Sequence, residues 1–298
     1  MSLTGREPSK DHTGENFPVA SVLIAPANRP VVMAFYAVAR MADDVADDPV
    51  APPDQKLARL AAIEASLTGA DEAVPEAVRL RHALAARGLS DQHMLDLLEA
   101  FRRDVTKTRY ADWDDLMDYC RYSAAPVGRF MLDVHGEPRT TWPASDALCA
   151  ALQVINHLQD CGKDYREIDR VYVPADALAA EGLDVCALGE AKASPALRRV
   201  ITSLTRRTDD LLAQSRRLSG GVSDARLALE IAVIQRLAES LTKRLLARDP
   251  LSERVHHRKP EALGVALLGV GRFAVERLGL GKRGDLGHKD AAQPTAPR

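Results

Sequence analysis

The apolar residues of this chain recur at helical spacing along most of its length. In the segment "PDQKLARLAAIEASLTG" (53–69), Leu57, Leu60 and Ile63 follow one another at intervals of three residues, which places them on one face of an α-helix. The run "RVYVP" at 170–174 is too short to seed a sheet. The sequence therefore predicts an all-α fold, with further helical segments at about 75–87, 90–103, 112–136, 144–166, 175–181, 195–218, 223–248 and 260–278.

The breaks between these segments are short and marked by proline, without a long glycine- and serine-rich linker. This organisation indicates one domain over residues 15–280. The polar residues 1–14 are expected to form a flexible N-terminus. Residues 281–298 lose nearly all apolar content and are expected to form a disordered tail.

Composition excludes several classes of protein. The formal net charge of −2 over 298 residues gives no basic field for nucleic acid. The four cysteines lack the spacing of a zinc site and are interpreted as reduced and structural. No apolar run approaches the roughly 18 residues that span a bilayer, so we expect a cytoplasmic protein, with contact at the inner membrane face as an open alternative.

The run "RMADDVADD" (40–48) puts four aspartates at the end of the most apolar helix. With Asp43 as the origin of a helical wheel, Asp47 lies at about 40°, Arg40 at about 60° and Tyr36 at about 20°, so the four share one stripe. A solvated helix end is the simpler interpretation. However, the helix dipole disfavours carboxylates at a C-terminal end, and this favours a functional site.

A second polar ridge lies in "LQVINHLQDCGKDYRE" (152–167), where Gln153, Asn156, Asp160 and Asp164 share one face of an otherwise apolar helix. Isolated buried carboxylates are costly, and two acidic ridges facing each other would repel unless a cation lay between them. Carboxylate and amide oxygens are the ligands of Mg²⁺, which also bridges to substrate phosphates. The two ridges together predict a Mg²⁺ site that holds a diphosphate.

These motifs resemble those of the squalene/phytoene synthase family. The likeness covers about residues 15–275 and includes "ENFPVAS" (15–21), "FYAVARMADDVAD" (35–47), "FRRDVTKTRYADWDDLMDYCRYSAAPVGR" (101–129) and "INHLQDCGKDYREIDRVYVP" (155–174). The resemblance implies a single-domain isoprenoid-synthase helical bundle around a central cavity. Within the family, the chain looks most like the bacterial hydroxysqualene-forming branch, which implies presqualene diphosphate and water as substrates, Mg²⁺ as cofactor and no nicotinamide.

The family's functional residues carry over onto matching positions of this chain. The resemblance implies that Asp43, Asp47, Asp160 and Asp164 bind the metal. It implies catalytic roles for Tyr36, Arg40 and Tyr122, and substrate-binding roles for Arg40, Gln153, Asn156, Arg170 and Arg109. For Arg109, capping of a helix that begins near Asp112 is an equally open interpretation.

Other functions stay open at this point. Sister enzymes of the same fold make presqualene diphosphate, squalene or phytoene from prenyl diphosphates. A chain-elongating prenyl transferase also has two aspartate-rich helices, but its second motif is normally another DDxxD, whereas this chain has "DCGKD" (160–164). A catalytically silent helical binding protein is the alternative of another class, and both complete motifs argue against it.

Three further features have simpler structural interpretations. His157 is interpreted as a satisfied polar group outside the metal set. The run "HHRK" (256–259) is interpreted as a solvated loop, and the segment 260–278 as a final core helix with membrane docking as the alternative.

Overall fold

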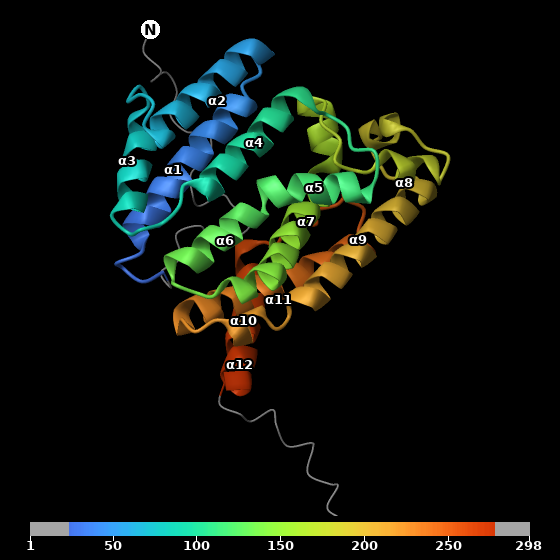
Figure 1. The fold of residues 1–298 in the computed structure, drawn as a ribbon. Helices are drawn as coiled ribbons and strands as arrows, with labels where there is room; N and C mark the ends of the chain where they lie inside the picture. Colours follow the sequence, from blue (N-terminus) through green and yellow to red (C-terminus); the bar gives the residue numbers. More distant parts are fainter. Residues whose placement is uncertain (1–23, 278–298) are drawn as a thin grey trace, which may run out of the picture.

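The computed structural model describes residues 24–277, and within them the fold is all-α, as the sequence predicts (Figure 1). Extended pairing among these residues is limited to an isolated parallel bridge between Arg109 and Val171. The predicted N-terminal segment 1–14 and tail 281–298 lie outside the described residues. The helices are α1 (Arg29–Ala46), α2 (Pro53–Thr68), α3 (Pro75–Ala85), α4 (Gln92–Thr106), α5 (Trp113–Ser123), α6 (Ala125–Val134), η1 (Arg139–Thr141), α7 (Trp142–Ile168), α8 (Ala175–Ala179), η2 (Val185–Gly189), α9 (Pro195–Ser215), α10 (Leu218–Gly221), α11 (Ala225–Ala247) and α12 (Lys259–Arg277).

Local sequence signals set many of the helix ends. Proline occupies the first turn of α1 and α7, where its fixed φ suits the helix and its missing N–H costs nothing. The side chains of Asp112 and Asp224 accept hydrogen bonds from the first turns of α5 and α11, which satisfies otherwise unpaired N–H groups. Gly69 ends α2 with a φ of +87°, a conformation that favours glycine.

The prediction of one helix over 112–136 is wrong, because α5 ends at Ser123 and α6 begins at Ala125. Ala124 leaves helical geometry with φ −122°, and Pro126 in the first turn of α6 has no N–H to continue the helix. Two residues later, a Cβ on Gly128 would lie 2.4 Å from the Ser145 side chain of α7. The break and the glycine together let α6 pack directly against α7.

Two apolar clusters form the interior. One is built mainly on α1 to α4, and the other mainly on α5, α7, α9 and α11. The Phe35 ring on α1 stacks on the Phe130 ring on α6 with a centroid separation of 3.9 Å, so α6 joins the first cluster to the rest of the bundle. In Figure 1, α1 to α4 form one layer, with α5 to α7 between it and the C-terminal helices. Among the described residues, no helix is long and apolar enough to cross a membrane.

Candidate active site

A cavity of about 350 Å³ opens where α1, α4, α5 and α7 meet the segment 170–172. The structure brings the four predicted metal-binding aspartates to this one cavity, together with Gln153, Asn156 and Arg170 from the predicted substrate-binding set. Its apolar part is lined by Leu97, Ala100, Phe101 and Ile168. Its polar lining also includes Asp104, Tyr119, Ser123, His157 and Tyr172.

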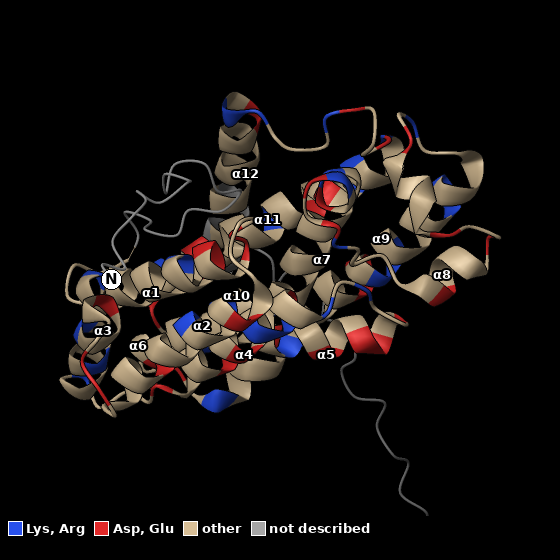
Figure 2. Ribbon diagram, turned by 90° about the horizontal axis from the view of Figure 1, so that it is seen from above, with Lys and Arg blue, Asp and Glu red and all other residues tan. Residues whose placement is uncertain are grey.

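The first aspartate motif ends α1. Val38, Ala42 and Val45 bury the opposite face of the helix, and this fixes the direction in which the acidic side points. Arg40 donates to Asp43 at 2.7 Å and to Asp44 at 3.2 Å. Acidic and basic segments adjoin along α1 in the view of Figure 2. Arg40 is therefore paired with the motif itself and is not among the described residues that line the cavity.

The second motif lies on α7, and its glycine has a packing reason. A Cβ on Gly162 would lie 2.6 Å from the Leu251 side chain and 3.2 Å from the Leu188 carbonyl oxygen. The sequence "DCGKD" therefore lets α7 approach the neighbouring segments closely on one side, while Asp160 and Asp164 face the cavity on the other.

Arg170 connects the first motif to the interior. Its Nη1 lies 3.0 Å from Oδ1 of Asp47, and its Nη2 donates to the backbone carbonyl of Asp104 at 3.2 Å. Arg170 is only 8% exposed, so these contacts fix its guanidinium at the cavity wall. It is well placed to meet an anion that enters beside Asp47.

Arg109 holds the residue that precedes Arg170 in the chain. Its guanidinium donates to both the backbone and the side-chain oxygens of Asp169, the left-handed residue that ends α7. The Val171 N–H donates to the Thr108 carbonyl at 2.9 Å. Arg109 is not among the described residues that line the cavity, so the structure places it as a residue that fixes the loop carrying Arg170.

Sequence reasoning did not single out Asp104, which forms the buried end of the cavity. Tyr119 donates to its carboxylate at 2.9 Å and Tyr172 at 3.4 Å. A signal was available, because Asp104 continues the helical stripe of Leu97, Ala100 and Phe101 on α4. A carboxylate in an apolar stripe needs partners inside the fold.

The tyrosine hydroxyl on Asp104 allows a stability test with a matched control. We expect Tyr119→Phe to lower the free energy of unfolding by about 1–2 kcal/mol, because a buried carboxylate loses a donor. The control is Tyr110→Phe: Tyr110 is equally buried, but its hydroxyl has no hydrogen-bond partner among the described residues. Denaturant unfolding of both variants checks this, and equal losses would contradict a specific role for the Tyr119 hydroxyl.

The negative charges of two carboxylates at the cavity, Asp104 and Asp164, are only partly offset by nearby cations and hydrogen-bond donors. Burial raises the pKa of Asp104 to about 7, and Asp47 and Asp43 push it in the same direction, while Arg170 and the Tyr119 hydrogen bond oppose the shift. Burial, followed by the neighbouring Asp160, raises the pKa of Asp164 to about 7. An arrangement of this kind favours the binding of a cation.

The carboxylate and amide oxygens at the cavity fit Mg²⁺ if water molecules and substrate phosphates supply the remaining ligands of the ion. Among the described residues, no three acidic, histidine or cysteine side chains are grouped closely enough to hold a metal ion. Each motif instead offers two carboxylates from its own wall of the cavity. This suits an ion that keeps several waters and is bound through one or two carboxylates and substrate phosphates.

The remaining sequence interpretations concern Tyr36, Tyr122 and the run "HHRK" (256–259). Tyr36 and Tyr122 are not among the described residues that line the cavity, and the Arg103 guanidinium lies 4.2 Å from the Tyr122 ring centre. Residues 256–258 of "HHRK" form a loop ahead of α12, as the sequence predicts, with Arg258 and Lys259 exposed and the two histidines half-buried. His256 lies 3.7 Å from the Asp160 carboxylate, and His257 is hydrogen-bonded to Ser240 at 2.9 Å.

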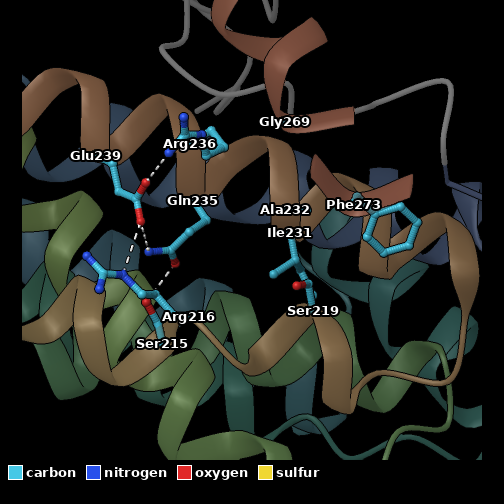
Figure 3. A pocket seen from close by; sticks show the side chains of 10 residues that line it. All are labelled: Ser215, Arg216, Ser219, Ile231, Ala232, Gln235, Arg236, Glu239, Gly269 and Phe273. Atoms are coloured by element: carbon cyan, nitrogen blue, oxygen red, sulfur yellow. Dashed lines mark hydrogen bonds and ion pairs between the residues drawn. The ribbon is translucent and has the colours of Figure 1, made fainter. Parts of the chain in front are cut away.

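A second hollow lies between the C-terminal end of α9 and the helices α10, α11 and α12 (Figure 3). Its volume of about 20 Å³ leaves space for about one water molecule. The side chains around it are already paired, with Ser215 donating to Gln235 at 2.7 Å and Arg236 donating to Glu239 at 2.8 Å. This hollow is a packing gap, and the acidic cavity is the candidate active site.

The helical bundle and its acidic cavity define an all-α enzyme of the isoprenoid-synthase type. The chain belongs to the squalene/phytoene synthase family, whose model matches residues 10–261. This confirms the family that the sequence motifs indicated.

Comparison with individual proteins refines this placement. The hydroxysqualene synthase of Zymomonas mobilis is 57% identical over 87% of this chain and 88% of the relative. That of Rhodopseudomonas palustris is 54% identical over 92% and 93% of the two chains. The squalene synthase HpnC of Alicyclobacillus acidocaldarius superimposes with a TM-score of 0.66 at 30% identity, over 90% of this chain and 91% of that one. Phytoene synthases match at lower identity, for example 29% for that of Thermus thermophilus over 80% of this chain and 82% of the relative.

Proposed function

We propose that this enzyme converts presqualene diphosphate and water into hydroxysqualene and diphosphate, with Mg²⁺ bound by Asp43, Asp47, Asp160 and Asp164. The observation that carries the proposal is the meeting of both aspartate motifs across one cavity of about 350 Å³. The printed names of the relatives that are 51–57% identical support the choice of reaction.

The polar end of the cavity would hold the diphosphate. Bound Mg²⁺ would neutralise the diphosphate and make it a competent leaving group. Arg170 is fixed beside Asp47 and would stabilise the negative charge that develops on the departing diphosphate oxygens. A guanidinium group matches phosphate geometry well. Gln153 and Asn156, one turn apart on α7, would orient the diphosphate by hydrogen bonds.

The apolar end would receive the hydrocarbon. Departure of diphosphate leaves a cyclopropylcarbinyl cation, which stray water would capture too early. Leu97, Ala100 and Phe101 on α4 line this part of the cavity and would exclude bulk water from the cation. The Phe101 ring could also stabilise positive charge through its negative face.

Product analysis tests the proposal directly. Purified protein with Mg²⁺ and no nicotinamide is given presqualene diphosphate or, in a separate reaction, farnesyl diphosphate. We expect hydroxysqualene from the first and no product from the second, measured by mass spectrometry. Presqualene diphosphate or phytoene formed from farnesyl diphosphate would instead place the enzyme in a sister branch of the family. Loss of the alcohol on chelation of Mg²⁺ is expected in addition.

Transient membrane contact through α12 is a second part of the proposal. The helix packs on α11, where a Cβ on Gly269 would lie 3.1 Å from Val233, yet Leu263, Leu267 and Leu268 are 62–64% exposed. These leucines offer an apolar face to a lipid surface, where so hydrophobic a substrate would partition. The same assay with substrate carried in lipid vesicles should run more slowly when Leu267 and Leu268 are replaced by serine. An unchanged rate would contradict the contact.

A further inference from the structure

His157 is a buried histidine in the cavity wall that the proposed metal and diphosphate contacts leave unused. It lies on α7, is 8% exposed and lines the cavity. Its Nε2 is buried and has no hydrogen-bond partner among the described residues. A buried polar atom without a partner is uncommon in folded proteins and calls for a ligand or a water molecule.

The position of the ring is fixed by its neighbours. The imidazole stacks on the Tyr172 ring, with a centroid separation of 3.4 Å and an interplanar angle of 13°. Tyr172 in turn donates to Asp104 at 3.4 Å. The His157 ring is therefore held by packing, with its Nε2 unpaired among residues 24–277.

Burial, with a smaller contribution from Arg170, keeps the His157 imidazole neutral. Burial lowers the pKa of His157 to about 3, and the nearby Arg170 guanidinium lowers it further, while Asp160 acts in the opposite direction. A neutral imidazole has one nitrogen that donates and one that accepts a hydrogen bond. It can therefore hold a water molecule with a lone pair free to react.

His157 lies on α7 close to the carboxylates beside which the diphosphate would leave. Asp160 lies three residues further on, which is a rise of about 4.5 Å along the helix. The carbon that loses diphosphate must lie next to the diphosphate site at the moment of ionisation. A water molecule on His157 would thus be within one helical turn of the carboxylates and close to the new cation.

We propose that His157 is the catalytic residue that holds the water molecule captured by the cation. This inference rests on the proposed function. After diphosphate leaves, the first cation rearranges by migration of a ring bond to a tertiary cyclopropylcarbinyl cation, which joins the two halves of the chain head to head. A lone pair of the water oxygen then forms the C–O bond at a ring carbon of this second cation, and the cyclopropane C–C bond to that carbon breaks. The electron pair of the broken bond forms a double bond to the former cationic carbon. The proton lost by the oxygen passes to the imidazole nitrogen. The conversion is redox-neutral, because one carbon loses a bond to oxygen and another carbon gains one.

The variants His157→Phe and His157→Leu test this role. Phenylalanine keeps a flat ring against Tyr172 but has no nitrogen, and leucine removes the ring as well. Diphosphate release and hydroxysqualene yield are measured separately on presqualene diphosphate. We expect diphosphate release to stay within a few-fold of wild type, because the residues proposed to bind diphosphate and metal are intact. The fraction of released diphosphate matched by hydroxysqualene should fall by at least about tenfold, with hydrocarbons formed by proton loss in its place.

Two outcomes would overturn the role of His157. One is a folded variant, verified by circular dichroism, that still forms hydroxysqualene as its sole product. The other is loss of diphosphate release in both folded variants, since this would assign His157 to ionisation and not to water capture. The proposed function is judged on the wild-type protein in oxygen-18 water: without labelled hydroxysqualene from presqualene diphosphate, the proposed reaction itself fails, whatever the variants do.

Discussion

Replacing Asp160 with asparagine is expected to reduce kcat for diphosphate release by about a thousandfold or more, which corresponds to roughly 4 kcal/mol of transition-state stabilisation. Asp160 faces the cavity from α7, opposite the carboxylates of α1. Asparagine keeps the size of the side chain but removes the charge that would bind Mg²⁺ beside the leaving group. Steady-state release of diphosphate at saturating substrate measures the effect.

The matched control for this variant lies on the same helix. Glu167 is near the C-terminal end of α7, is exposed and is not among the described residues that line the cavity. Glu167→Gln removes one negative charge from α7 without touching the cavity, and its kcat should remain within about twofold of wild type. Normal turnover by Asp160→Asn would exclude Asp160 from the metal site.

Asp164→Asn is expected to stabilise the metal-free protein at about pH 8, by on the order of 3 kcal/mol. The pKa of this carboxyl rises from 3.8 to about 7 through burial and then the neighbouring Asp160. Between these two pKa values, the folded protein keeps a proton that the unfolded chain has already lost. Stability therefore falls as pH rises through this window, and above it the folded protein holds an unfavourable buried charge that asparagine removes.

The pH dependence of the stabilisation distinguishes this explanation from a simple packing gain. Thermal unfolding is followed in the presence of a chelator at about pH 5 and pH 8, with Glu167→Gln as the control. The advantage of Asp164→Asn should shrink strongly at the lower pH, where the wild-type carboxyl is already protonated. An equal gain at both values would mean that the charge of Asp164 does not cause the effect. Asp43 is less suitable for this test, because Arg40 already donates to it at 2.7 Å.

The local pattern of the sequence was sufficient for the helical class and for the two acidic faces. Period-3.6 spacing identifies which side of a helix is apolar without knowledge of any neighbour. For this reason Asp43 and Asp47 on one helix, and Asp160 and Asp164 on another, could be identified as two ridges from the sequence alone. The sequence also predicted that the two ridges face each other. The structure places both ridges on one cavity.

Local pattern was less informative where backbone geometry or packing decides the outcome. The break between α5 and α6 depends on the single residue Ala124 ahead of Pro126, inside a segment whose periodicity continues without interruption. The resemblance to known enzymes likewise assigned Tyr36 and Tyr122 to the site, yet neither is among the described residues lining the cavity. Their catalytic roles remain predictions.

By itself, then, the sequence determined the all-α class, the family and the two aspartate ridges, because each depends on residues within one helix or one continuous motif. Only the tertiary structure decided that Asp104, Tyr119 and Tyr172 form one hydrogen-bonded wall, and that Arg170 pairs with Asp47 across more than a hundred residues of chain. Within the part of the chain that the structure describes, it also gives the buried Nε2 of His157 no hydrogen-bond partner. The physical reason is that hydrogen bonds, ion pairs and burial depend on distances between helices, and helical periodicity carries no information about those distances.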